Sequence, residues 1–224
     1  MRGLPRLFIV DCAMALAARW RTFVLGLAVA ASSAALPASA GSELTDVEAS
    51  ALEAGRLVVR EENVERTGRH YIGGVSYIVI DASPEQVTAA LDDVRTYRQI
   101  LPNTRSVRWI GLTRKGDTLV ELEQGNAIAH GKYTVRVRRE PGPSESPAST
   151  YRFWLDQRYF HDLADANGFF HLEPRGDKTL LTYLVMVDLG PGIFGRLFEG
   201  KIRRAALSTP ALVKSYVEAH RPPV

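Results

Sequence analysis

The sequence predicts an α+β fold in which a curled antiparallel sheet of about six to seven strands surrounds a long C-terminal helix and leaves an internal cavity. Two observations carry this prediction. Strand patterns follow one another from Thr104 to Leu189, and a helical pattern of apolar residues then runs from Phe194 to Tyr216. A sheet with one apolar face must cover it, and the terminal helix is the longest element available.

The first elements predicted are a short helix and two strands. Thr45 and Glu48 form a capping box and Gly55 is a stop signal, so residues 46–54 are expected to be helical. The strands that follow are Leu57–Glu65 and Arg69–Asp81, with the turn at Thr67-Gly68. Apolar residues occupy both faces of the second strand, which predicts that both faces are covered. Its Gly73-Gly74 pair indicates a bulge or a close backbone contact.

Two helices are predicted next. Ser83-Pro84-Glu85-Gln86 is a strong helix start, because Ser83 can cap, Pro84 fits the first helical position and Gln86 completes the box. A second short helix near Thr96–Leu101 is stopped by Pro102.

Six further strands precede the C-terminal helix. They are Thr104–Thr113, Thr118–Gln124, Gly131–Glu140, Tyr151–Tyr159, Gly168–Glu173 and Thr179–Leu189. Pro210 is expected to kink the helix. The loop Gly190–Gly195 combines glycines with apolar residues, which fits a lid over a ligand or a membrane contact during transfer, and equally a plain turn.

The first forty residues have the parts of a secretory signal peptide. Arg19 and Arg21 precede the uncharged stretch Thr22–Leu36, and Ala38-x-Ala40 supplies small residues for signal peptidase. The stretch is shorter than the roughly 20 residues of a membrane-spanning helix. We therefore expect a periplasmic or secreted protein cleaved near Ala40, with a retained anchor as the alternative.

Removal of this segment changes the composition. The chain of 224 residues has 28 basic and 25 acidic residues, and residues 1–40 contain four arginines, one aspartate and Cys12, the sole cysteine. The remaining 41–224 would have 24 of each sign and no cysteine. A neutral exported domain is not expected to bind nucleic acid or to rely on disulfides. A start at Met14 would give the signal peptide a short basic segment of ordinary length.

No motif in the sequence assigns catalysis or a metal. The histidines lack metal-site spacing, and His161-Asp162 with Asp165 is more typical of a solvated loop. Glu121 and Glu123 are expected to face water, with acid–base work as the alternative. No cofactor is expected. A basic strand face is predicted to be solvated, with anionic membrane contact as the alternative; it holds Lys132, Arg136, Arg138 and Arg139.

The element order is that of the helix-grip fold, and several motifs occur in a family order. They are Ile78–Val87, Leu91–Val94, Tyr97 with Ile100-Leu101-Pro102, and Gly168-x-Phe170-x-Leu172-Glu173-Pro174 with Thr182-Tyr183. In this order they resemble the START-like (SRPBCC) superfamily, in its polyketide cyclase/dehydrase and coenzyme-Q-binding-like branch. The resemblance covers roughly 71–220. The domain is therefore placed at 69–224, with 41–68 as an N-terminal extension.

This resemblance implies a cavity that binds a lipid, isoprenoid, polyketide or other apolar molecule, and it does not imply catalysis. Aromatic residues at inward positions are the candidates for ligand contact, with ordinary core packing as the alternative for each. They are Tyr97, Trp109, Tyr133, Phe153, Phe170, Tyr183, Phe194 and Phe198.

Three hypotheses on function follow. The first is an exported binding or carrier protein for a hydrophobic small molecule such as a lipid, an isoprenoid quinone or a polyketide, with a transient membrane contact during transfer. The second is an aromatase/cyclase-type enzyme that uses the same cavity, which requires an acid–base pair that the sequence does not place. The third is a cell-envelope interaction protein with a filled core.

Overall fold

The computed structural model describes residues 43–125, 130–142, 148–191 and 193–220, apart from the side chains of 193–197. The predicted signal peptide 1–40, with Met14 and Ala40, lies outside the described residues. None of the described helices is long and apolar enough to cross a membrane.

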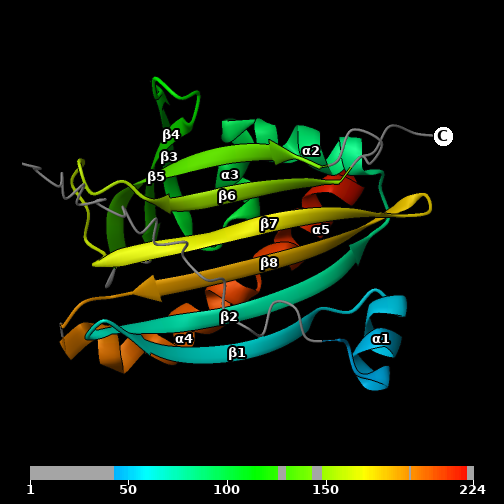
Figure 1. Ribbon diagram of the computed structural model, residues 1–224, viewed down its shortest axis with the longest axis horizontal. Coiled ribbons are helices and arrows are strands. Elements are labelled where there is room, and N and C mark those ends of the chain that lie inside the picture. Colours follow the sequence, from blue (N-terminus) through cyan, green and yellow to red (C-terminus); the bar gives the residue numbers. More distant parts are fainter. Residues whose placement is uncertain (1–42, 126–129, 143–147, 192, 221–224) are drawn as a thin grey trace, which may run out of the picture. The chain divides into compact units, whose positions relative to one another are not determined.

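Eight strands form one antiparallel sheet in the order β1-β2-β8-β7-β6-β5-β4-β3 (Figure 1). Their bounds are β1 Val58–Arg66, β2 Arg69–Ile80, β3 Thr104–Leu112, β4 Thr118–Gly125, β5 His130–Pro141, β6 Ser149–Leu155, β7 Asp165–Arg175 and β8 Lys178–Asp188. Seven of them, β2 to β8, belong to the predicted domain, and β1 belongs to the N-terminal extension. The predicted fold class is confirmed, with one strand more than stated.

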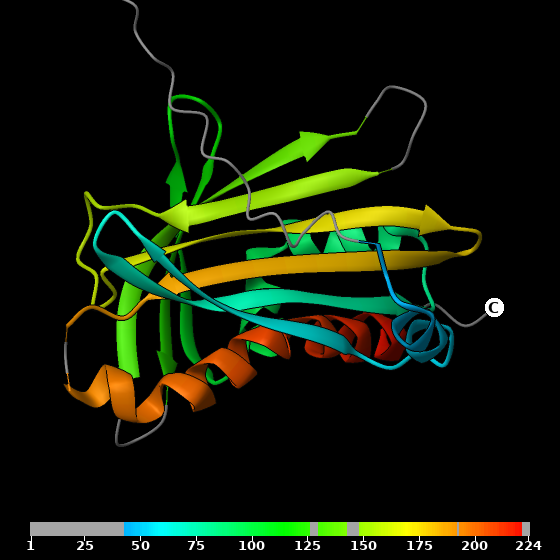
Figure 2. The same cartoon turned by 60° about the horizontal axis from the view of Figure 1, so that its bottom comes forward.

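The helices are α1 Asp46–Glu53, α2 Pro84–Asp92, the 3₁₀ turn η2 Val94–Thr96, α3 Tyr97–Ile100, α4 Ile193–Leu207 and α5 Thr209–Ala219. Figure 2 shows α4 and α5 running one after the other beneath the curled sheet. We call the sheet face beneath which they run the concave face, and the opposite face the outer face. The C-terminal helix is broken at Ser208, and Pro210 lies in the first turn of α5 rather than in the middle of one helix.

Both predicted capping boxes are present. The Thr45 hydroxyl accepts from the Glu48 amide while the Glu48 carboxylate accepts from the Thr45 amide, and Ser83 and Gln86 make the same pair of bonds at α2. Glu48 also accepts from the Arg60 guanidinium on β1 at 2.6 and 2.8 Å. These bonds hold the pKa of Glu48 down at about 2. The same carboxylate thus caps α1 and ties it to β1.

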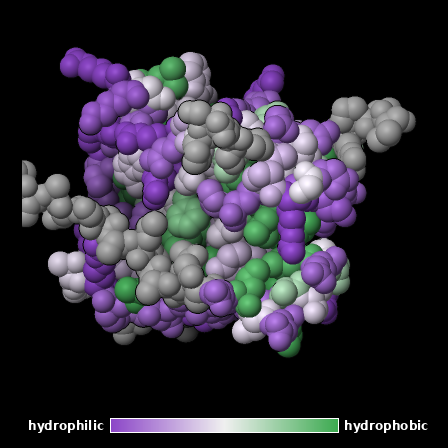
Figure 3. Space-filling model, turned by 45° about the vertical axis from the view of Figure 1, so that its right-hand side comes forward, coloured by the Kyte–Doolittle hydropathy of each residue, from purple (hydrophilic) through white to green (hydrophobic). Residues whose placement is uncertain are grey.

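Strand β2 is apolar and buried on both faces, as predicted. Ile78 and Ile80 pack on the concave face within the main core, together with Val213 of α5. Val75, Tyr77 and Val79 point to the outer face, where Leu52 of α1 belongs to the same buried cluster. Figure 3 shows that some apolar residues, in green, remain at the surface in the right-hand half of that view. The N-terminal extension therefore covers outer-face surface that the core domain leaves apolar.

Strand β6 ends earlier than predicted. The alternating pattern suggested a strand to Tyr159, but β6 ends at Leu155 because Asp156 starts a turn. The Asp156 carbonyl accepts from the Tyr159 amide and its carboxylate accepts from the Arg158 amide. An aspartate that bonds to the backbone two residues on is typical of a turn.

Helix α4 is fastened to the β1–β2 hairpin by His70. Its Nδ1 lies 2.5 Å from Glu65 and its Nε2 lies 2.6 Å from Glu199 of α4. The bonds to Glu199 and then Glu65 raise the pKa of His70 above its usual value. Arg203 of α4 adds an ion pair with Glu61 of β1 at 2.9 Å.

Replacement of His70 by glutamine is expected to loosen α4 in a pH-dependent way. A raised folded-state pKa gives a contribution that is fully present below the unfolded pKa of about 6.5 and is lost as the pH rises through the folded value. Amide hydrogen exchange of α4 should be faster in His70→Gln than in the wild type at about pH 6, and equal near pH 9. His130→Gln, at an exposed position, is the control. If α4 exchanges at the same rate in His70→Gln and in the wild type at both pH values, His70 does not hold α4 to the hairpin.

Candidate ligand-binding site

An aromatic cluster occupies the middle of the concave face. Phe153, Phe170 and Tyr183 project from the neighbouring strands β6, β7 and β8, with ring centroids 4.5 Å apart for Phe170–Tyr183, 5.8 Å for Phe153–Phe170 and 6.0 Å for Phe153–Tyr183. Phe170 and Tyr183 are register partners, and Phe153 is paired with Gly168. A Cβ atom at Gly168 would lie 2.1 Å from the Leu184 carbonyl oxygen of β8 and 2.4 Å from Phe153 Cζ, so glycine allows the close approach of β8 and also leaves room for this ring.

Tyrosine hydroxyls supply polar groups around this cluster. Tyr133 donates to Gln124 Oε1, Tyr97 donates to the Leu91 carbonyl, and Tyr151 donates to Asp92 Oδ1. Burial raises the pKa of Tyr97, Tyr133, Tyr151 and Tyr183 far above that of a free phenol. At neutral pH these phenols are protonated, and Tyr97, Tyr133 and Tyr151 are the hydrogen-bond donors just described.

The eight predicted contact residues divide into two groups. Five lie in the concave core or against it: Tyr97, Tyr133, Phe153, Phe170 and Tyr183. Trp109 lies on the edge strand β3 and is 60% exposed, away from the cluster. Phe198 is half-buried on α4, where the Lys201 ammonium lies 5.7 Å from its ring centroid. The side chain of Phe194 is outside the described residues.

Sequence reasoning missed Ser76. This residue is fully buried on β2, and its hydroxyl has no hydrogen-bond partner in the part of the chain that the structure describes. Its register partner on β8 is Tyr183, so it lies beside the aromatic cluster. The alternation that places Ile78 and Ile80 on the concave face also places Ser76 there. A buried hydroxyl without a partner is costly, and a polar group of a ligand would satisfy it.

A pocket of about 290 Å³ opens between α2–α3 and the sheet. Leu91, Val94 and Tyr97 line its helical side, and Val137 and Tyr151 line its sheet side. Leu91, Tyr97 and Tyr151 are members of the main core, and the other two pack against it. This pocket is therefore a place where the concave core meets the surface.

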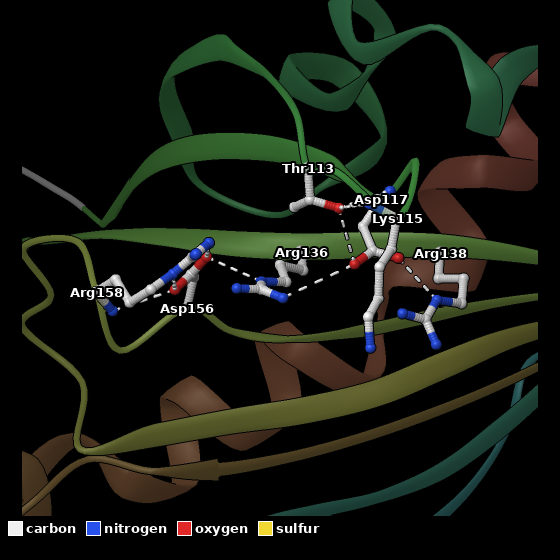
Figure 4. Close-up of polar contacts among 7 residues, drawn as sticks. All are labelled: Thr113, Lys115, Asp117, Arg136, Arg138, Asp156 and Arg158. Atoms are coloured by element: carbon white, nitrogen blue, oxygen red, sulfur yellow. Dashed lines mark hydrogen bonds and ion pairs between the residues drawn. The ribbon is translucent and has the colours of Figure 1, made fainter.

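The basic face of β5 is largely neutralised by buried carboxylates. Arg138 donates to Asp117 at 2.7 Å, and Arg136 donates to Asp156 at 2.9 Å, as Figure 4 shows. The bonds from Arg138 hold the pKa of Asp117 below its usual value, and those from Arg158 do the same for Asp156. The sequence predicted the arginines but gave no indication of the two aspartates that pair with them.

Other charged candidates are engaged in surface ion pairs. Glu121 pairs with Arg108 at 2.9 Å and with Lys132 at 3.1 Å, and Glu123 pairs with Arg105 at 3.7 Å. Among the described residues, no group of three or more His, Cys, Asp or Glu side chains could hold a metal ion.

Two comparisons by sequence give one match. Residues 80–208, more than half of the chain, match the family model described as polyketide cyclase / dehydrase and lipid transport. The comparison with curated proteins finds no match.

Solved structures share the fold at low identity. The STAR-related lipid transfer protein of Xanthomonas axonopodis has a TM-score of 0.61 at 17% identity, over 79% of this chain and 97% of that one. The Zhui aromatase/cyclase of Streptomyces sp. R1128 has 0.51 at 17%, over 71% and 94%. Human StAR-related lipid transfer protein 5 has 0.53 at 10%, over 71% and 86%. At these identities the likeness shows the fold alone.

Proposed function

This chain belongs to the polyketide cyclase/dehydrase and lipid transport family, and from that premise we propose that it is an exported carrier of a hydrophobic small molecule such as a lipid, an isoprenoid quinone or a polyketide. The ligand is held against the concave face by apolar burial, and one or two hydroxyls orient it. A transient membrane contact during transfer belongs to the same proposal.

The observation that carries the proposal is the unpartnered Ser76 hydroxyl beside the cluster of Phe153, Phe170 and Tyr183. An apolar wall with a buried polar atom that lacks a partner suits a ligand that is mostly hydrocarbon and carries a hydroxyl or carbonyl. The names of the lipid transfer proteins among the structural neighbours agree with such a ligand.

Recovery of a bound molecule tests this function. Full-length protein purified from its native cells is extracted with organic solvent, and the extract is analysed by mass spectrometry. We expect about one apolar molecule per chain. In parallel, delipidated protein should take up tetradecanol, a neutral amphiphile, in competition with the apolar dye Nile red. An empty extract together with no uptake of either probe would refute the carrier function.

Export rests on the sequence of residues 1–40. We expect the protein in the periplasm or medium to begin at Gly41, because signal peptidase requires the small residues Ala38 and Ala40. N-terminal sequencing of the purified protein checks this. Ala38→Trp should leave the precursor unprocessed, whereas Ser33→Thr, inside the apolar stretch, should be cleaved normally. A mature protein that retains residues 22–36 would support an anchor instead.

A cyclase-type enzyme is the second candidate, and the buried phenols favour it. Tyr133 and Tyr183 are neutral phenols on the concave face, close enough together for a charge on Tyr183 to raise the pKa of Tyr133. The Tyr133 hydroxyl would exchange Gln124 for a substrate oxygen. Such donors stabilise an enolate or a ketone oxygen during ring closure. Tyr133→Phe and Tyr183→Phe should abolish turnover of a polyketide substrate if the protein is an enzyme, and should leave uptake of tetradecanol within about twofold if it is a carrier.

A further inference from the structure

The pocket between α2–α3 and the sheet has a cationic rim over an apolar floor. Besides its core residues, it is lined by three basic residues, Lys115, Arg138 and Arg139, and by two acidic residues, Asp92 and Asp117. Lys115 projects from the β3–β4 turn, and Figure 4 shows it pointing to the same side as Arg138. The rim therefore contains one positive charge more than negative charges.

Both carboxylates of the rim are already engaged. Asp117 is 1% exposed and bonds to Arg138 and to the Thr113 hydroxyl at 3.1 Å. Asp92 accepts from Tyr151 at 2.7 Å and from Arg139 at 3.0 Å. They hold the two arginines in place, so neither carboxylate needs to move when an anion approaches.

The donors of the rim are only partly used. Arg138 donates one hydrogen bond through Nε to Asp117 and lies over Trp154, whereas Arg139 donates one through Nη1 to Asp92 and lies over Tyr151 of the concave core. Because side chains alternate along β5, the two guanidinium groups reach the rim from opposite faces of the strand. Lys115 forms no ion pair with any residue that the structure describes. Guanidinium and ammonium groups with spare N–H donors bind carboxylates and phosphates through charge-assisted hydrogen bonds.

We propose that this pocket binds the anionic head group, a carboxylate or a phosphate, of the amphipathic ligand whose apolar part lies against the concave core. The inference rests on the proposed function, because the pocket floor of Leu91, Tyr97 and Tyr151 is part of the core that holds the apolar part. It narrows the ligand class from hydrophobic molecules in general to acids such as fatty acids, acidic polyketides or phospholipids.

An anionic and a neutral amphiphile with chains of equal length, together with a free oxyanion, test the proposal. Myristate, tetradecanol and inorganic phosphate are titrated against Nile red-loaded full-length protein, in the wild type, in Lys115→Ala and in Arg114→Ala. Arg114 is the matched control, since it is an exposed cation in the same turn that does not line the pocket. The wild type should bind myristate at least about threefold more tightly than tetradecanol, as expected for a partly exposed charge pair. Lys115→Ala should remove most of this preference, and Arg114→Ala should keep it.

Other outcomes would overturn the proposal, and they show whether the head-group site alone or the carrier function as well is rejected. Uptake of tetradecanol without a preference for myristate, or an equal preference in Lys115→Ala, would leave the carrier function standing and reject the head-group site. Lys115-dependent binding of inorganic phosphate without any preference for myristate would assign the pocket to free oxyanions and reject an amphipathic ligand there. Failure of both amphiphiles to bind would refute the carrier function and the head-group site together.

Discussion

Replacement of Phe170 by alanine is expected to weaken binding of a hydrophobic ligand at least about tenfold, because burial of a phenylalanine ring against an apolar partner contributes about 1.5–3 kcal/mol. Phe170 lies in the concave cluster, with its ring centroid 4.5 Å from that of Tyr183. The measurement is displacement of Nile red by tetradecanol from delipidated protein.

Phe169 provides a matched control for this variant. It is the adjacent residue of β7 with the same 9% exposure, but it packs in the outer-face cluster with Leu184 and Met186. Both alanine variants should lose about 3–5 kcal/mol of unfolding free energy. Only Phe170→Ala should lose affinity, and Phe169→Ala should stay within twofold of the wild type. An equal loss in both variants would mean that general destabilisation explains the effect and that the concave face is not the site.

Gly74→Ala is expected to be among the most destabilising single substitutions and to lower the free energy of unfolding by about 3 kcal/mol or more. Gly74 lies on β2 at a φ of 139°, and an added Cβ atom would lie 2.0 Å from the Arg60 carbonyl oxygen of β1. The backbone of β1 and β2 would have to separate, which would weaken the attachment of the N-terminal extension. Urea unfolding monitored by circular dichroism gives the free energy.

Gly116→Ala separates backbone strain from this close contact. Gly116 also has a positive φ, 83°, but nothing lies within 4 Å of its Cβ position. Gly116→Ala should lower the free energy of unfolding by only about 1–2 kcal/mol, the cost of an alanine in the left-handed region. Equal losses in the two variants would show that φ, and not the approach of β1, determines the requirement for glycine at position 74.

Local signals in the sequence predicted most of the fold. The capping residues Thr45 and Ser83 sit where the helices begin, and the close contact expected at Gly73-Gly74 is present. The caps depend on neighbours in the chain, which a single sequence displays, and a glycine pair inside a strand pattern marks a close approach without showing which strand approaches. The end of β6 was predicted wrongly because the bonds of Asp156 that start the turn compete with an alternating pattern.

The site was less predictable because its residues meet only through strand register. Phe153, Phe170 and Tyr183 could be assigned to one face by alternation. Their contact also depends on Gly168 of β7, because a side chain there would overlap the Phe153 ring of β6. Trp109 follows the same alternation and is nevertheless exposed, on strand β3 at the edge of the sheet, whereas Val107 of the same strand packs against the core. The pairing of Arg136 and Arg138 with Asp156 and Asp117 joins segments about 20 residues apart, and charge counts cannot show it.

The site on the concave face is tested most directly by photo-crosslinking with a fatty acid that carries a diazirine at the end of its chain. Side chains alternate between the two faces along β7 and β8, so the labelled residue identifies the face by itself. We predict labels at Phe170, Tyr183 and Val185, whose side chains belong to the concave core. Labels at Phe169, Leu184 and Met186 instead would place the ligand on the outer face and contradict a carrier that uses the concave face.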